Sequence, residues 1–519
     1  MNYRNRVIWL IIVASLVRMI VAAVTELSND EVYYWTYAQH LQWNYFDHPP
    51  LIAVLIRVFT GNLLVQEEFF VRLGAIACGA VNTWQMYLLG RQLKNEYAGW
   101  LAACLFTASV YGSILGGLMI LPDAPQMVFW LWGVLLLVNI FNEVSEGARS
   151  NKRWLLFGLV AGLCIMSKVH GVFLWGGAGL YIMIYRRSLL KNPFLYLALL
   201  ITVVLISPIY WWNRAHDFIT LNYHGNRVGF FGAVQWDSFF RQLIGEFLYN
   251  NPVNVVLQFM ALHAMRKMPL LSTTANQRIL LMLSLPLVAV VWFMALFKDT
   301  LPHWTGPAYS TLIPLAAAYL AQRLERRQLL PLFPKVMRYS LALPAILLIV
   351  LVTSIQWLPV GLGSKDDQKL GSGDLLLDMS GWHQMGRAFD SLYKRDVAQG
   401  IMKPGAYLIT DYWFPAAHVD YYVARPAKMP LIAVGSYANI HHYAWLNRHK
   451  APLQPGQDAY YMAVSNYYDP LSPSIKNTFH SIEPPVMIDQ LRAGKVVRHF
   501  YVVRLRGYQG GIPHSGVLP

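Results

Sequence analysis

The side chains that could do acid–base or metal chemistry begin in one long segment near the start of the chain. Asp30 and Glu31 follow the first apolar run, and Asp47 and His48 stand before two prolines further along. A carboxylate can take the proton of a hydroxyl group, and carboxylates with imidazoles can bind a divalent metal. By spacing alone the same acids would also fit a solvated loop. The recurrence of ionisable residues at later positions favours a functional site.

Those later residues lie beside the ends of further apolar runs. Asp123 stands alone in the otherwise uncharged turn LMILPDAP, and Lys168 interrupts a long apolar stretch. An ionisable residue at membrane depth is a functional candidate, although a lysine can also extend its ammonium group to the membrane surface. The other candidates are His224, Arg227, His303 and Trp304. A lone histidine among them could equally be an ordinary loop residue, whereas the cations together could neutralise a phosphate.

Composition indicates which elements must hold these residues. The 519 residues are 56% hydrophobic and only 13% charged, where a soluble domain is about 25% charged. A helix needs roughly 20 apolar residues to cross a bilayer. Candidate spans lie at residues 8–24, 73–90, 98–118, 125–141, 154–167, 169–185, 193–212, 252–265, 279–297, 304–321 and 339–359. The sequence therefore predicts a polytopic α-helical membrane protein with about 11 transmembrane helices, the first of them retained rather than cleaved.

The distribution of charge predicts the orientation in the bilayer. Basic residues follow every second candidate span, while the intervening loops carry fewer basic residues and more acids, including Asp30, Asp47 and Asp123. Cytoplasmic loops are enriched in Lys and Arg, so the N-terminus is expected in the cytoplasm and the acidic loops outside. This arrangement accounts for the net charge of +15 without a nucleic-acid partner. The three cysteines lie inside apolar segments and predict neither a disulfide nor a cysteine metal site.

The last third of the chain differs from the rest because it contains no long apolar run. Residues 1–360 are expected to form the transmembrane domain, with a long first outer loop at 25–72 that includes an amphipathic interfacial helix. Residues 361–519 are expected to form a soluble α/β domain on the outer face, beginning with a linker at 361–373. Its expected strands lie at 406–410, 431–434, 460–464 and 496–503, and its expected helix at 375–390.

The order of the polar motifs resembles the GT-C family of membrane glycosyltransferases that includes protein O-mannosyltransferases and the aminoarabinose transferase of lipid A. The resemblance covers the membrane part and extends into the C-terminal part. The matching pieces are Asp30-Glu31, YFDHPPL at 45–51, LPDAP at 121–125, GLCIMSKVHG at 162–171, HDF and NYHGNR within 216–227, LPHWTGPAY at 301–309, TDYWFPAAHVDYYV at 410–423 and VGSYANIHHYAWL at 434–446. Each motif is weak alone, but their order and spacing make the combination specific.

The resemblance implies an inverting transfer of a sugar from a polyprenyl phosphate to an acceptor at the periplasmic face of a bacterial inner membrane. The acceptor would be an envelope glycolipid such as lipid A, a glycan or a protein. Asp30 matches the principal catalytic acid of the family, with Glu31 beside it and Asp123 assisting or binding sugar hydroxyls.

The resemblance also implies binding residues. Asp47 and His224 match positions that can hold a divalent metal, and Lys168 and Arg227 match positions near the carrier phosphate. The aminoarabinose transferase has Glu-Lys before the proline where this chain has Asp47 and His48, so the chain departs from that pattern at the expected metal site.

Elementary chemistry agrees with a transfer reaction of this kind. A sugar phosphate leaves easily once its charge is balanced, which a cation or a metal can do. A hydroxyl acceptor needs a base, and Asp30 is the candidate; a phosphate acceptor would instead leave Asp30 to orient the substrate. Two other classes remain open, a multi-span transporter or lipid flippase and a scaffold. A transporter would place its polar groups at the bilayer centre and show repeated halves, neither of which the sequence displays.

Overall fold

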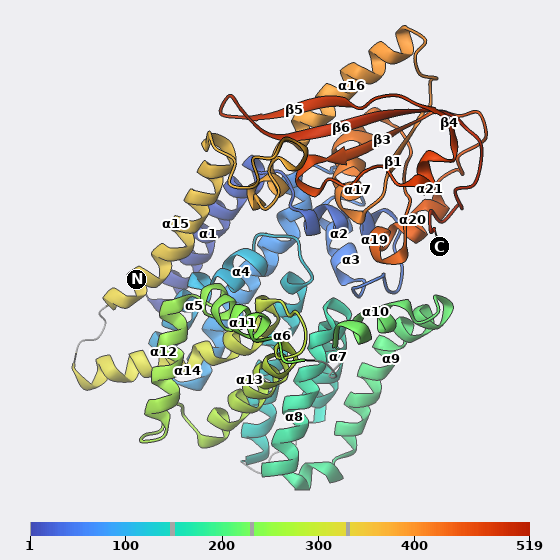
Figure 1. Ribbon diagram of the computed structural model, residues 1–519. Coiled ribbons are helices and arrows are strands. Elements are labelled where there is room, and N and C mark those ends of the chain that lie inside the picture. The colour runs from blue at the N-terminus through green and yellow to red at the C-terminus, as the bar shows by residue number, and fades with distance from the viewer. Residues whose placement is uncertain (1, 146–150, 229–232, 329–332, 519) are drawn as a thin grey trace. The chain divides into compact units, whose positions relative to one another are not determined.

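The computed structural model describes residues 2–145, 151–228, 233–328 and 333–518, and within these ranges it leaves the side chains of residues 144, 145, 224 and 226–228 undescribed. The chain forms two compact units (Figure 1). We call Met1–Ile20 with Leu41–Leu347 the helical unit, and Val21–His40 with Leu348–Pro519 the C-terminal unit. Two helices, the first and the fifteenth, run from one unit into the other, and each unit is described by itself.

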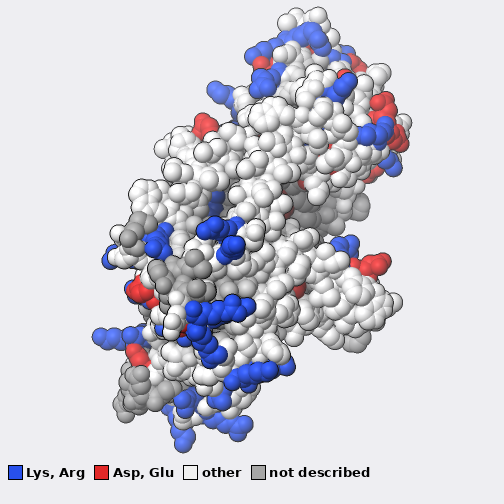
Figure 2. Space-filling view, turned by 90° about the vertical axis from the view of Figure 1, so that its left-hand side faces the viewer, with Lys and Arg blue, Asp and Glu red and all other residues white. Residues whose placement is uncertain are grey.

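The helical unit consists of helices that follow the apolar runs of the sequence. Its helices, with the two shared ones, are α1 Tyr3–Val24, α3 Leu51–Phe59, α4 Glu68–Leu93, α5 Glu96–Ala108, α6 Asp123–Ser145, α7 Asn151–Ser167, α8 Val172–Tyr185, α9 Pro193–Ala215, α10 Ile219–Val228, α11 Trp236–Tyr249, α12 Pro252–Met265, α13 Thr274–Ala295, α14 Gly306–Arg326 and α15 Lys335–Trp357. Every candidate span of the sequence overlaps one of these helices. In Figure 2 the lower end of the view, which belongs to this unit, carries many Lys and Arg side chains.

Five of these helices are long and apolar enough to cross a membrane: α1, α6, α9, α13 and α15. Two shorter apolar helices cover 169–185 and 252–265. The segment at 98–118 differs from the prediction of one continuous helix. There α5 ends at Ala108, and a π-helical turn, Tyr111–Leu115, follows it. This interruption redirects the chain before Asp123, where α6 begins.

Small residues allow the helices of this unit to pack closely. A Cβ atom at Gly158 of α7 would lie 2.3 Å from the carbonyl oxygen of Ala198 on α9. At the same contact between α7 and α9, the Thr202 hydroxyl of α9 donates a hydrogen bond to the Gly158 carbonyl at 2.7 Å. Small residues and interhelical hydrogen bonds of this kind hold helices together where lipid removes the hydrophobic driving force.

The C-terminal unit contains a six-stranded sheet in the order β2-β1-β3-β6-β4, with β5 also paired to β6. The strands are β1 Tyr407–Thr410, β2 Leu431–Ala433, β3 Ala459–Val464, β4 Phe479–Ile482, β5 Val486–Arg492 and β6 Lys495–Tyr508. The helices are α2 Asn29–Gln39, α16 Trp382–Ala398, α17 Trp413–Val419, α18 Arg425–Ala427, α19 Tyr437–Ile440, α20 Tyr443–Leu446 and α21 Pro473–Lys476. Strand β1 is parallel to β2 and β3, and β6 is antiparallel to β3, β4 and β5.

The strands of this unit were only partly expected from the sequence, and the unit also contains Val21–His40, which the expected domain at 361–519 did not include. The four expected strands are confirmed as β1, β2, β3 and β6, whereas β4 and β5 were not expected. The expected helix at 375–390 is wrong in its first turns, because 375–379 form a 3-10 turn and α16 begins at Trp382.

A segment from the start of the chain, residues 21–40, is part of the C-terminal unit. The Glu26 carboxylate accepts hydrogen bonds from the backbone amides of Trp382 and His383 at 2.8 and 2.9 Å, and so caps the N-terminus of α16. Residues 31–38 of α2 are buried. The expected amphipathic helix corresponds to α2, which ends at Gln39. It is enclosed by protein, because aromatic residues of the C-terminal sequence pack around it.

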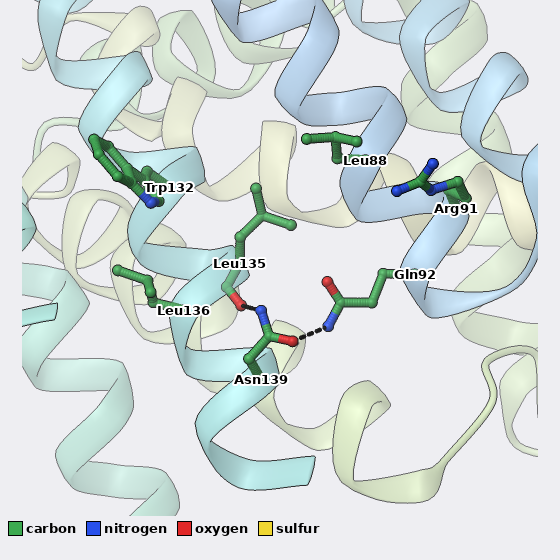
Figure 3. Close-up of a pocket in the computed structure, with 7 residues that line it drawn as sticks. All are labelled: Leu88, Arg91, Gln92, Trp132, Leu135, Leu136 and Asn139. Atoms are coloured by element: carbon green, nitrogen blue, oxygen red, sulfur yellow. Dashed lines mark hydrogen bonds between the residues drawn. The ribbon is translucent and has the colours of Figure 1, made fainter. Parts of the chain in front are cut away.

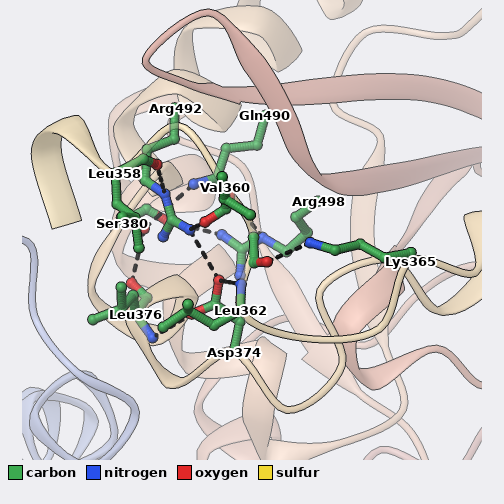
Figure 4. A network of polar contacts seen from close by, with 11 residues as sticks. Leu358, Val360, Leu362, Lys365, Asp374, Leu376, Ser380, Gln490, Arg492 and Arg498 are labelled. Carbon is green, nitrogen blue, oxygen red and sulfur yellow. Dashed lines mark hydrogen bonds and ion pairs between the residues drawn. The ribbon is translucent and has the colours of Figure 1, made fainter. Parts of the chain in front are cut away.

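The expected linker at 361–373 is held by a polar network (Figure 4). The Arg492 guanidinium at the end of β5 donates to the carbonyls of Leu358 and Val360 and pairs with Asp374 at 3.0 Å. The Asp374 carboxylate also accepts a hydrogen bond from the backbone amide of Leu362, at 3.0 Å. The chain that leaves α15 is therefore fixed to the edge of the sheet.

Candidate functional site

Asp123 and Lys168 form a buried ion pair in the helical unit. The Lys168 Nζ atom lies 2.9 Å from Oδ1 and 2.8 Å from Oδ2 of Asp123, and both residues are at most 4% exposed. The Tyr111 hydroxyl donates to the same carboxylate at 3.0 Å. The two residues that the sequence singled out separately thus meet at the N-terminus of α6 and the C-terminal end of α7. Because their charges compensate each other, burial in an apolar surrounding is tolerated.

His303 and Trp304 lie in the 3-10 turn Pro302–Thr305 that precedes α14. The His303 imidazole interacts electrostatically with both Asp123 and Lys168. Burial and the Lys168 ammonium lower the pKa of His303 to about 4, against the opposing effect of Asp123, so the imidazole is neutral near pH 7. The Trp304 ring lies 5.5 Å from the ring of His170, which follows Lys168 by two residues. This turn therefore belongs to the same centre, which we call the Asp123 centre: Tyr111, Asp123, Lys168 and His303.

The Asp123 centre is fixed by close packing against the start of α14. A Cβ atom at Gly306 would lie 2.4 Å from the ring of Tyr111, so only glycine fits there. The turn Pro302–Thr305 also contacts a buried acid of α11, because the Thr305 side chain hydrogen-bonds to the Glu246 carboxylate. Glu246 accepts hydrogen bonds from Trp292 at 2.8 Å and Tyr309 at 3.1 Å.

Asp30 and Glu31 stand in the first turn of α2, in the C-terminal unit. The Glu31 carboxylate is buried and accepts from the backbone amide and the hydroxyl of Ser28 at 2.9 and 3.0 Å, which closes a capping box. Asp30 is exposed at the same helix N-terminus, where the helix dipole favours a negative charge.

A second carboxylate of the C-terminal unit, Asp378, interacts electrostatically with Asp30 and accepts a hydrogen bond from Asn29. Burial, together with the charge of Asp30, raises the pKa of Asp378 to about 6, although the Arg498 guanidinium opposes this. Asp378 was not singled out from the sequence, because it lies in the segment 375–390 that was expected to be an ordinary helix.

The Asp47 segment packs against α10 within the helical unit. The Phe46 and Tyr223 rings lie 4.7 Å apart, and the Thr220 hydroxyl donates to the Tyr45 carbonyl at 3.0 Å. Asp47 and His48 are half-buried. The side chains of His224 and Arg227, on α10, lie outside the described part of the structure.

These contacts bring the Asp47 segment beside the helix that carries His224. Among the described side chains, no group of three or more His, Cys, Asp or Glu residues is placed to hold a metal ion. The metal site at Asp47 and His224 therefore stays a prediction.

The helical unit also has a hollow of about 460 Å³ between α4 and α6 (Figure 3). Its walls are Leu88, Arg91, Gln92, Trp132, Leu135, Leu136 and Asn139. Asn139 lies near the opposite end of α6 from Asp123, so this hollow is separate from the Asp123 centre and contains none of the predicted site residues.

Comparisons with known proteins agree with this arrangement of helices. The sequence model of the dolichyl-phosphate-mannose-protein mannosyltransferase family matches residues 47–212. The lipid A galacturonosyltransferase RgtD of Rhizobium johnstonii is 24% identical over 330 residues, which cover 62% of this chain and 64% of that protein.

The solved structure of ArnT from Cupriavidus metallidurans bound to undecaprenyl phosphate matches with a TM-score of 0.60 at 14% identity, covering 96% of this chain and 98% of that chain. The apo structure of the same protein matches with a TM-score of 0.56 at 14% identity, covering 99% of each chain. The chain therefore shares its fold with ArnT. The chain spans less than two thirds of the length of RgtD, and its likeness to ArnT is one of fold.

Two residues at or near the Asp123 centre were not singled out from the sequence. Tyr111 lies within a run that reads as an ordinary apolar span, so nothing marks it as a partner of Asp123. Arg18 did leave a signal, a single charge inside the first apolar run. It is 1% exposed and contacts Ser113, 95 residues away in the sequence.

Proposed function

We propose that the protein transfers a sugar from a polyprenyl-phosphate carrier to an envelope acceptor at the periplasmic face of a bacterial inner membrane. The observation that carries this proposal is the Asp123 centre, a buried ion pair with a tyrosine and a neutral histidine at the end of two apolar helices. The fold shared with a protein solved with undecaprenyl phosphate supports a polyprenyl carrier as donor.

In the proposed reaction, the acceptor hydroxyl attacks the anomeric carbon of the donor sugar as the bond from that carbon to the phosphate oxygen breaks. Polyprenyl phosphate leaves with the bonding electrons, and Asp30 takes the hydroxyl proton. The exposed position of Asp30 supports this role, because a base must reach solvent or substrate. Arg227, Lys168 or both would stabilise the phosphate, although Lys168 is already compensated by Asp123.

The proposed topology has 11 spans, a cytoplasmic N-terminus and a periplasmic C-terminal unit. It is supported by the overlap of each candidate span with a helix, although the span at 98–118 extends past α5 into a π-helical turn, and by the basic residues that recur in every second loop. With this orientation, α6 begins and α7 ends at the outer face, as a periplasmic reaction requires.

A divalent metal at Asp47 and His224 is part of the proposal. It is supported by the packing of the Phe46 ring on the Tyr223 ring, which brings the neighbouring Asp47 and His224 onto adjacent segments. A bound metal would supply charge stabilisation to the phosphate. Chelation should then lower donor binding, measured with purified protein and fluorescent or radioactive donor, and unchanged binding after chelation would make both residues structural.

The acceptor that we propose is a glycolipid of the lipid A type. The similarity to a lipid A galacturonosyltransferase supports it. Mass spectrometry of envelope lipids from a strain lacking the gene, compared with the same strain carrying the gene, tests this choice. We expect the deletion to remove one sugar mass from lipid A or its core. A change confined to polysaccharide or protein glycans would replace the acceptor, and unchanged glycans and lipids would contradict the proposed function.

A further inference from the structure

Arg18 places a full positive charge inside the first apolar helix. Its side chain is 1% exposed, and no acidic residue of the described part of the chain pairs with it. Its donors instead go to Ser113: Nε to the carbonyl oxygen at 3.0 Å and Nη2 to the hydroxyl at 3.2 Å. A buried charge at membrane depth is costly and is usually retained for a specific task.

Two glycines, Gly79 and Gly117, lie against the guanidinium. A Cβ atom at Gly79 of α4 would lie 3.0 Å from Nη1 of Arg18, and one at Gly117 would lie 3.1 Å from Cζ. Both would also meet backbone atoms at 3.0 Å or less. Two different segments thus leave space for this one side chain, and the enclosure leaves no room for a ligand beside it.

The backbone beyond α5 explains why Arg18 is needed there. In the π-helical turn Tyr111–Leu115, the amide of Gly116 bonds to the Tyr111 carbonyl, and the amides of Leu118 and Met119 both bond to the Ile114 carbonyl. None of these amides donates to the Ser113 carbonyl. The carbonyl instead accepts a hydrogen bond from the Arg18 guanidinium. A backbone carbonyl without a partner is expensive in an apolar surrounding, so the guanidinium completes the hydrogen bonding of the turn.

The same turn carries Tyr111, whose hydroxyl reaches Asp123 at 3.0 Å. We propose that Arg18 is a positioning residue for the Asp123 centre: by binding Ser113 it fixes the π-helical turn so that Tyr111 reaches the Asp123 carboxylate. Lysine is a poor substitute, because its compact ammonium group lacks the planar fork with which the guanidinium reaches the Ser113 carbonyl and hydroxyl from two separate nitrogen atoms. The activity readout of this inference rests on the proposed transfer reaction.

The test combines a structure and a double-mutant cycle on the full-length protein in lipid nanodiscs. In the experimental structure of Arg18→Met we expect the Tyr111 hydroxyl to leave hydrogen-bond distance of Asp123, whereas the wild type keeps it. For transfer, Tyr111→Phe should lower kcat/KM by roughly tenfold to a hundredfold, the loss expected for a hydrogen bond to a charged group. Arg18→Met should cause a similar loss in the wild type but only a small one, less than about threefold, in the Tyr111→Phe background.

An unchanged Tyr111–Asp123 contact in Arg18→Met, or equal losses in both backgrounds, would overturn the inference. If Arg18→Met does not accumulate in the membrane, Arg18→Lys takes its place with the same two measurements and the same expected signs. If the wild type transfers no sugar from any donor, the proposed function fails, and the structural comparison still decides the role of Arg18.

Discussion

The two acids that the sequence singled out first, Asp30 and Asp123, occupy opposite kinds of surroundings. Asp123 is 2% exposed and gives both carboxylate oxygens to Lys168. Asp30 is exposed at the N-terminus of a helix whose other side is buried. A carboxylate that is already neutralised holds structure, whereas an accessible one can accept a proton. We infer that the Asp123 pair stabilises the helical unit, and we keep Asp30 as the candidate for the proposed base.

The largest expected effect is the loss of sugar transfer in the Asp30→Asn variant. Removing a general base lowers the rate by roughly 10²–10⁴-fold, and we expect a loss in this range. Because Asp30 is exposed, the melting temperature should change little. Steady-state transfer and thermal unfolding of the purified variant measure both effects, with Asp390→Asn on α16 as a control at a partly exposed acid. Transfer close to wild type would remove Asp30 from the mechanism.

For Asp123→Asn we expect a large loss of stability, unlike the small change expected for Asp30→Asn, because the substitution leaves the Lys168 charge buried without compensation. Breaking a buried ion pair from one side costs about 3–5 kcal/mol, so the variant should melt at lower temperature or fail to accumulate in the membrane. The double variant Asp123→Leu, Lys168→Met removes both charges and should recover most of this stability while remaining inactive. A single variant as stable as the wild type would show that the pair is not structural.

A smaller effect on the same centre is expected for Gly306→Ala. The added Cβ would lie 2.4 Å from the Tyr111 ring, and overpacking of this kind costs about 1–3 kcal/mol. Both stability and transfer should fall, because Tyr111 is displaced from Asp123. Gly176→Ala on α8 is the matched control, since no atom lies within 4 Å of its added Cβ. Equal behaviour of the two variants in thermal unfolding would contradict the packing argument.

The smallest expected effect is that of Glu31 substitutions on transfer, and it distinguishes the role of Glu31 from that of its neighbour Asp30. If Glu31 acts as a helix cap, Glu31→Gln should keep transfer within about threefold, because glutamine also closes a capping box. Glu31→Ala should instead lose about 1 kcal/mol of stability, as other lost caps do. A loss of transfer in Glu31→Gln as large as that of Asp30→Asn would assign Glu31 to the chemistry.

The sequence predicted helices reliably where the signal is local. Apolar runs mark the candidate spans, and Lys168 and Asp123 were noticed because each is a lone charge in an apolar context. Their pairing joins positions 45 residues apart, which no local pattern reports. The same limit explains why Arg18 was visible as a charge while its partner Ser113 was not.

Long-range packing also explains the errors in the C-terminal unit. Strand β5 alternates between exposed and part-buried residues over its first four positions and contains polar side chains, so it lacks the apolar run that marked β1 and β3. Helix α2 was expected at the lipid surface because it is aromatic. Those aromatic residues are covered by partners from the far end of the chain: Tyr33 lies 4.9 Å from Trp413, and Trp35 lies 5.0 Å from Tyr421, ring to ring.

Sugar transfer itself is tested most directly by reconstituting the purified wild-type protein with a polyprenyl-phosphate sugar and lipid A, and by measuring both products by mass spectrometry. The account predicts that glycosylated lipid A and free polyprenyl phosphate appear together in equal amounts. Release of neither product from a panel of polyprenyl-phosphate sugars and envelope acceptors would contradict it.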